Sequence, residues 1–149
     1  MASIGKWNAP SSVVTVLSTE LDSLANNAMT AASSAIANQT NLDMYVDIEV
    51  NLASLSPTTG AYVALYISEA IDGSNYPAQS AADMRLAVTQ LLCPIPIGTT
   101  AATAQRTAVR NVVIPPGTFK IYLDNQTGVS LASSGSTVKF LPYNVNLNG

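Results

Sequence analysis

Alternation of apolar and polar residues is the strongest regular pattern along this chain. In Met44–Leu52 every second residue is apolar, and tyrosine, acidic residues and asparagine stand between. A period of two is typical of a strand with one buried and one solvated face. The same pattern returns in Tyr62–Ile67 and in Thr118–Asp124. All three segments are predicted to be β-strands.

Weaker strand candidates are short and rich in β-branched or aromatic residues. They are Val13–Leu17, Arg85–Leu92, Arg106–Ile114, Gly128–Ala132 and Thr137–Leu141. Clusters of Gly, Pro, Asn, Asp and Ser separate the candidates and favour turns. About eight short strands punctuated in this way predict an all-β fold, a sandwich or a barrel, rather than an α/β fold.

Two segments do not follow the strand pattern. Residues 21–36 place apolar side chains three and four apart, as on one helix face, but Asn and Ser pairs interrupt them. A short helix or turn near Thr19–Ala25 stays open, followed by a strand near Met29–Ala37. Residues 1–12 show no periodicity and are interpreted as an extended N-terminal arm, which leaves 13–149 as one domain.

The composition limits the kinds of partner. The chain has 149 residues and is 48% hydrophobic but only 10% charged. Low charge favours permanent assembly, although it is equally explained as a habit of composition. The net charge is −3 and the six Lys and Arg residues are scattered, so we expect no nucleic-acid partner. No apolar run suits a signal peptide or a membrane span, and we expect neither.

The chemistry of the chain argues against catalysis. It contains no histidine, which removes the Ser-His-Asp triad and the usual zinc ligand sets. Asp47 and Glu49 share a strand face, but a solvated outer face explains them better than paired-carboxylate hydrolysis. Cys93 lies in an apolar run and is interpreted as a small buried hydrophobe. We predict a protein that is not an enzyme, with no cofactor and no metal.

Two sets of residues are candidates for binding. Asp72, Asn75 and Tyr76 form an oxygen-rich turn that suits calcium or a sugar, although an ordinary surface turn is favoured. Ile4 and Trp7 lie on the arm, where Trp7 either folds back onto its own core or anchors the arm to a neighbour. Alternation turns three tyrosines outward on adjacent candidate strands, and these complete the candidate interface: Tyr45, Tyr62 and Tyr66.

Four segments together carry a family resemblance. They are Leu21–Ala37, Asn41–Tyr45, Tyr66–Pro77 and Val113–Lys120. In their strands and turns they resemble small virion proteins of tailed bacteriophages. That resemblance implies an antiparallel β-sandwich of jelly-roll type that decorates or cements a capsid, or sits on the tail. It also implies synthesis in the host bacterial cytoplasm, a virion location, a major capsid protein or other virion protein as partner, and a homo-oligomer, with a trimer favoured.

Two hypotheses of function remain. The first is a structural virion protein, a decoration or cement subunit that stabilises the head by bridging major capsid subunits. The alternative is an outward-facing or tail-associated glycan-binding module on the same fold, with the exposed tyrosines as its platform. Because few residues are charged, we expect the contact with a partner to depend only weakly on salt.

Overall fold

The chain folds as an all-β protein, as the alternation predicts. The computed structural model describes residues 6–77 and 91–146. Within these ranges there is one 3-10 turn, η1 (Thr19–Leu21), and no α-helix. The strands are β1 (Lys6–Trp7), β2 (Val14–Leu17), β3 (Ile36–Ala37), β4 (Tyr45–Leu55), β5 (Tyr62–Ala70), β6 (Leu91–Pro96), β7 (Thr103–Val113), β8 (Thr118–Gln126), β9 (Thr137–Tyr143) and β10 (Val145–Asn146).

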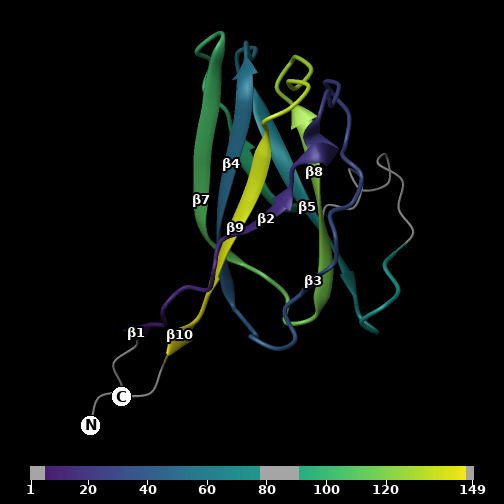
Figure 1. The fold of residues 1–149 in the computed structure, drawn as a ribbon, viewed down its shortest axis with the longest axis vertical. Helices are drawn as coiled ribbons and strands as arrows, with labels where there is room; N and C mark the ends of the chain where they lie inside the picture. The colour runs from purple at the N-terminus through teal and green to yellow at the C-terminus, as the bar shows by residue number, and fades with distance from the viewer. Residues whose placement is uncertain (1–5, 78–90, 147–149) are drawn as a thin grey trace.

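The strands pair as one long nested hairpin. β1 pairs with β10, β2 with β9, β3 with β8, β4 with β7 and β5 with β6, all antiparallel. Rolling up this hairpin adds two further pairs, β4 with β9 and β5 with β8. The result is two four-stranded sheets, β2-β9-β4-β7 and β3-β8-β5-β6, packed face to face (Figure 1). This is the double Greek key of a jelly roll, so the predicted sandwich is confirmed.

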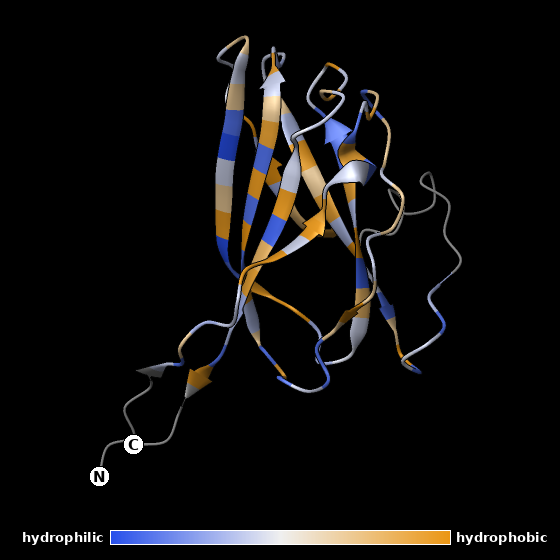
Figure 2. Cartoon of the chain, in the orientation of Figure 1, coloured by the Kyte–Doolittle hydropathy of each residue, from blue (hydrophilic) through white to orange (hydrophobic). Residues whose placement is uncertain are grey.

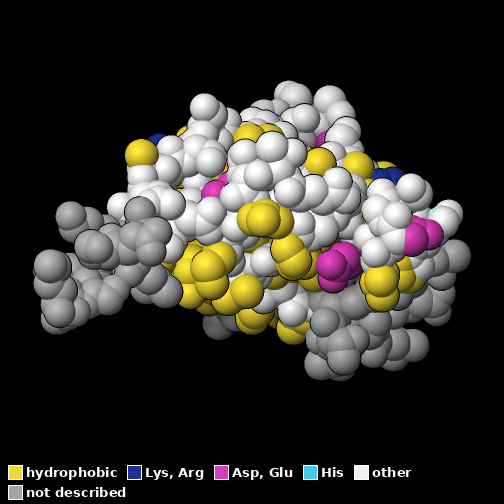
Figure 3. All heavy atoms as spheres, turned by 90° about the horizontal axis from the view of Figure 1, so that it is seen from below, with side chains coloured by type: hydrophobic (Ala, Val, Ile, Leu, Met, Phe, Trp, Pro, Cys, Tyr) yellow, Lys and Arg dark blue, Asp and Glu magenta, His cyan; other side chains and the backbone are white. Residues whose placement is uncertain are grey.

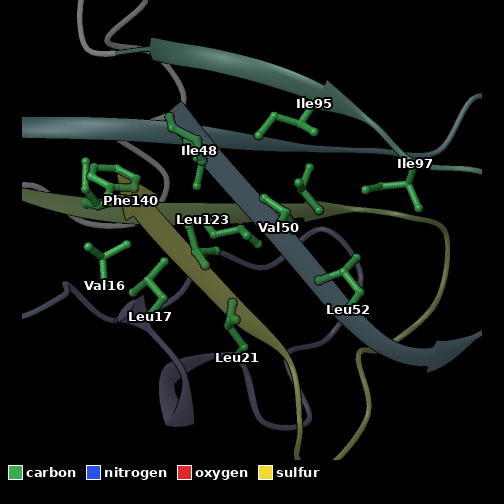
Figure 4. Close-up of a cluster of buried hydrophobic side chains, with 14 of the residues drawn as sticks. Val16, Leu17, Leu21, Ile48, Val50, Leu52, Ile95, Ile97, Leu123 and Phe140 are labelled. Atoms are coloured by element: carbon green, nitrogen blue, oxygen red, sulfur yellow. The ribbon is translucent and has the colours of Figure 1, made fainter. Parts of the chain in front are cut away.

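The inner faces of the two sheets form the core. Orange and blue bands alternate along β4 in Figure 2, and the inward residues are fully buried. Ile48, Val50 and Leu52 of β4 lie in one buried cluster with Leu123 of β8 and Ile95 of β6 (Figure 4). Each inward position is apolar because its side chain must interdigitate with the facing sheet. The alternation in the sequence therefore results from the packing of the two sheets against each other.

Most of the predicted strands are present, with shifted ends. The three strongest candidates correspond to β4, β5 and β8, and three weaker ones to β2, β7 and β9. Of Arg85–Leu92, residues 85–90 lie outside the described residues, and β6 begins at Leu91. The strand predicted over Gly128–Ala132 is wrong, because that segment is an irregular turn held by side-chain hydrogen bonds. The open choice at Thr19–Ala25 resolves as the single turn η1.

The segment predicted as a strand at Met29–Ala37 is only partly regular. Ile36 and Ala37 pair with β8, but from Met29 to Ala35 regular pairing is limited to the bridge between Met29 and Asp124. The segment still runs along β8, because Thr30 and Ser33 donate backbone N–H groups to β8 carbonyls. Their hydroxyls in turn accept the N–H groups of Leu123 and Ile121. Serine and threonine side chains thus replace backbone partners where the strand register fails.

Asn125 on β8 joins three parts of the chain. Its side chain is fully buried, and its amide nitrogen donates to the carbonyls of Leu24, Ala25 and Val129. Its amide oxygen accepts the backbone N–H and the hydroxyl of Thr127. These bonds satisfy the polar groups of two irregular loops that leave the sheet on either side. They explain why the 128–132 segment turns away rather than pairing as a strand.

β1 and β10 form a ribbon that projects from the sandwich (Figure 1). β1 and β10 pair there, and Asn8 and Ser11 donate backbone N–H groups to the carbonyls of Asn144 and Pro142. The described part of the predicted arm is therefore ordered against the C-terminal end of its own chain. Asp43 holds the ribbon to the body, since its carboxylate accepts bonds from Ser11 Oγ (3.5 Å) and Asn144 Nδ2 (3.3 Å).

Replacing Asn125 tests its role as a tie. Asn125→Ala leaves several buried carbonyl groups without a donor, so we expect the free energy of unfolding to fall by about 3 kcal/mol. For a chain of this size the unfolding midpoint would drop by roughly 6–12 °C in a thermal melt. Ser130→Ala, an exposed position in the same loop, is the control and should change little. Equal melting curves for the two variants would contradict the proposed tie.

Candidate functional site

Two of the predicted interface residues, Trp7 and Tyr45, contact the same tyrosine at the end of the sandwich that carries the β1–β10 ribbon. Tyr45 of β4 pairs in register with Tyr143 of β9, and their rings stack at 5.8 Å. Trp7 on the ribbon contacts the same Tyr143 edge-on at 5.4 Å, yet it remains 67% exposed. Trp7 is therefore neither folded into its own core nor fully free, and Tyr143 joins it to Tyr45.

Tyr143 was not among the residues predicted from the sequence. The predicted strand Thr137–Leu141 ends before Pro142, and proline is usually confined to the ends and edges of strands. In the structure β9 continues through Pro142 to Tyr143. The signal available in the sequence was the continued alternation of Lys139, Leu141 and Tyr143 on one face.

A β-bulge places polar groups next to this aromatic cluster. Val46 pairs with Val112 and Ile48 with Val109, so Arg110 and Asn111 together oppose the single residue Asp47. Asn111 has φ 58°, and its backbone N–H donates to Asp47 Oδ1 at 3.0 Å. The bulge turns two consecutive side chains toward the outer face, which a regular strand does not do.

The Tyr143 hydroxyl completes this polar group. It lies 2.6 Å from Asn111 Oδ1 and 3.1 Å from Asp47 Oδ1. Burial raises the pKa of Tyr143, and the hydrogen bond to Asp47 and the charge of that carboxylate raise it further. The hydroxyl thus stays protonated as a donor at neutral pH. From the sequence, Asp47 is considered as one half of a carboxylate pair. In the structure its carboxylate instead accepts the hydrogen bonds that stabilise the bulge.

Two adjoining hollows lie on the outer face of the β9-β4-β7 part of the sheet, and together we name them the trough. They have volumes of about 380 and 300 Å³ and share Asp47, Arg110 and Leu141. Trp7 borders the first, and Glu49, Arg106 and Lys139 border the second. Arg106 Nε donates to Glu49 Oε2 at 2.9 Å. The trough therefore combines an exposed indole with alternating acidic and basic groups.

The lower end of the sandwich carries exposed apolar side chains, which gather on the face shown in Figure 3. We name Leu42, Met44 and Val113 the apolar end. Each is at least half exposed, and they are neighbours because Val113 pairs with Tyr45 and Ile114 N–H donates to the Met44 carbonyl. Asn38 fixes this loop by bonding both backbone groups of Asp43 and the Pro115 carbonyl.

The three tyrosines do not form one platform. Tyr45 lies on the β2-β9-β4-β7 sheet, whereas Tyr62 and Tyr66 lie on β5 in the other sheet. Tyr62 is exposed at the opposite end of the molecule from Tyr45. The prediction that Tyr66 is exposed is wrong, because it is 8% exposed and packs with Met29, Ala64 and Tyr122. Ile4 lies outside the described residues.

The candidate ligand loop is a self-contained turn. Asp72 Oδ1 accepts the backbone N–H groups of Ser74 and Asn75, and Oδ2 accepts the Asn75 side-chain amide. These bonds lower the pKa of Asp72 to about 2, with the Asn75 backbone bond the largest cause. The Tyr76 ring is covered by Lys120 Nζ at 4.4 Å from its centre. The oxygens and the ring that a ligand needs are thus engaged within the protein.

Other chemistry-bearing groups form no further site in the described ranges. Burial raises the pKa of the half-buried Cys93 thiol to about 11, which keeps it protonated and unreactive. Among the described residues no three His, Cys, Asp or Glu side chains gather as metal ligands. No helix in these ranges has the length and apolar character needed to cross a membrane.

Comparisons with known proteins add little beyond the fold. No protein-family model matches the chain, and no curated protein is similar to it in sequence. One similar solved structure is Xyl-CBM35 in complex with a glucuronic acid-containing disaccharide (13% identity, TM-score 0.46, 99% of both chains). Another is the CBM36-1 domain of a multidomain xylanase from the hindgut metagenome of Trinervitermes trinervoides (12%, 0.43, 93% of this chain and 98% of that one).

A viral protein is also similar. The structure of Desmodium yellow mottle tymovirus matches at 14% identity with a TM-score of 0.36, over 95% of this chain and 89% of that one. At such low identities and TM-scores, these likenesses support no functional conclusion. The jelly-roll assignment rests on the strand pairing of the chain itself.

The Asp72 turn can be tested by titration. We expect its carboxyl group, followed by NMR, to titrate near pH 2. Because this pKa is lowered, the turn's contribution to stability is present above pH 3.8 and is lost as the pH falls through about 2. Asn75→Ala removes the side-chain donor, so the pKa should rise but stay below 3.8, since the backbone donors remain. An unchanged titration in the variant would refute this account.

Proposed function

We propose that this chain is a structural subunit of a virus particle that attaches to a neighbouring protein through its apolar end. The observation that carries the proposal is Leu42. Its backbone adopts the left-handed conformation with φ 50°, which is unfavourable for a large side chain, yet the residue is 54% exposed. Burial within the monomer does not offset the strain, so contact with a partner is the reason we infer for it.

The surroundings of Leu42 support a protein partner. Met44 and Val113 extend the apolar surface, and the exposed Trp7 contacts Tyr143, which stacks on Tyr45 opposite Val113. Aromatic residues, Met and Arg are enriched at protein interfaces. The finer assignment, a capsid decoration or cement protein that bridges major capsid subunits, draws on the resemblance of four segments to phage virion proteins. The low charge of the chain and the exposed apolar surface at one end of the domain agree with this finer assignment.

A saccharide-binding role is the second candidate. The specific observation in its favour is the trough, where the exposed Trp7 indole borders a hollow lined by Asp47, Arg110 and Asn111. Sugar rings pack their C–H faces on aromatic rings and bond through hydroxyls to charged and amide side chains. In this second candidate function, the trough takes the place of the tyrosine platform predicted from the sequence.

Leu42→Gly separates attachment from stability. Glycine adopts the left-handed conformation without strain, so the free energy of unfolding should stay the same or rise by about 1 kcal/mol. Attachment to the particles of the virus that encodes the chain, measured by co-sedimentation, should weaken about tenfold. The matched control is Ala102→Gly, since Ala102 has φ 54° on a loop at the other end of the sandwich. Equal attachment of both variants would rule out Leu42 as a contact.

Deleting residues 1–12 tests the arm. The domain should remain folded because the first strand of the sandwich, β2, begins at Val14. Attachment or oligomerisation should weaken, since Trp7 and the Ser11 bond to Asp43 are lost. Thermal melts and sedimentation velocity measure the two effects. Unchanged attachment would show that the arm is only a tail, and an unfolded product would show that the sandwich needs the ribbon in order to fold.

A further inference from the structure

The trough is bordered by more cationic than anionic side chains. Three cations border it, Arg106, Arg110 and Lys139, against two carboxylates, Asp47 and Glu49. It is thus a locally positive surface on a chain whose net charge is −3. Such a surface favours an anionic ligand, and the remaining question is which chemical class fits it.

Both carboxylates are already bonded within the protein. Two guanidinium nitrogens of Arg106 contact Glu49 Oε2. Asp47 Oδ1 accepts the Asn111 N–H and lies within hydrogen-bond distance of the Tyr143 hydroxyl. These bonds compensate the acidic charges, so the carboxylates are held in place rather than available to bind a cation.

Two of the cations remain available. The Arg110 side chain is 77% exposed, and its Nη1 is 3.9 Å from Asp47 Oδ2, at the limit of an ion pair. Lys139 stands opposite Glu49 in the β4–β9 pair, but Glu49 is bonded to Arg106, and Lys139 has no ion pair among the described residues. A guanidinium that is free on its outer side binds a carboxylate by two parallel hydrogen bonds.

We propose that the trough binds an oligosaccharide that carries carboxylate groups, with Arg110 and Lys139 on the carboxylates and the Trp7 indole against a sugar ring. This inference rests on the second candidate function and names its ligand class. Sugar hydroxyls both donate and accept, which suits a floor where Asp47 and Glu49 alternate with cations. A polyphosphate has no apolar ring face to pack against the exposed Trp7 indole, so the trough suits a saccharide better.

Tri-galacturonate and its methyl ester are the probes, because they share one sugar backbone and each carboxylate of the acid is an uncharged methyl ester in the other. Binding to the full chain is measured by isothermal titration calorimetry and by NMR shift changes. We expect the acid to bind at least tenfold more tightly than the ester. Arg110→Gln and Lys139→Gln should each reduce that ratio at least threefold, and Trp7→Ala should weaken both ligands.

Lys120→Gln is the matched control, since Lys120 lies on the other sheet over Tyr76 and should leave the ratio unchanged. If acid and ester bind equally, the saccharide role stands and the inference about charge is wrong. If neither binds, both are wrong. An equal effect of Lys120→Gln would overturn the site, and so would penta-glutamate binding as tightly as the acid, because the trough would then be a surface for acidic peptides.

Discussion

The fold depends on burying one face of every strand pair in a single nested hairpin. Each pair alone has one apolar face, and two-stranded ribbons are marginal in water. Rolling the hairpin brings β4 beside β9 and β5 beside β8, so that the inner residues of both sheets cover one another. When the hairpin rolls up in this way, the first and last strands, β1 and β10, remain outside the sandwich. The ribbon of β1 and β10, and with it the exposure of Trp7, follows from the way the core closes.

Uncharged polar side chains hold the chain wherever regular pairing stops. Asn125 ties two loops to β8, Thr30 and Ser33 replace missing backbone partners, and Asn38 fixes the loop at the apolar end. The carboxylate of Asp47 does the same for the N–H group that the bulge at Asn111 leaves without a backbone partner. The high content of Ser, Thr and Asn is therefore partly structural. These side chains have short reach and few rotamers, and each satisfies buried backbone groups at little entropic expense.

The sequence was sufficient for the regular half of the molecule and not for the site. Alternation located β4, β5 and β8 because packing against a facing sheet imposes a period of two on each. It did not show that Tyr66 is covered, since an outward residue becomes buried only when an irregular segment, here around Met29, crosses the outer face. It also misassigned 128–132, whose β-branched and apolar residues resemble a strand, because the bonds to Asn125 are non-local. The bulge at Arg110 could not be predicted, because the residue types of Arg106–Ile114 do not show where the alternation is interrupted.

The two proposed surfaces are compatible on one subunit because of how β4 is placed. Tyr45 lies at the apolar end, whereas Asp47 and Glu49 stand two and four residues further along the strand. A strand rises about 3.3 Å per residue, so Glu49 is roughly 13 Å above that end. A partner seated on Leu42, Met44 and Val113 thus leaves the upper part of the trough open to solvent. Trp7 borders the trough, and its contact with Tyr143, which stacks on Tyr45, places the ribbon between the trough and the apolar end.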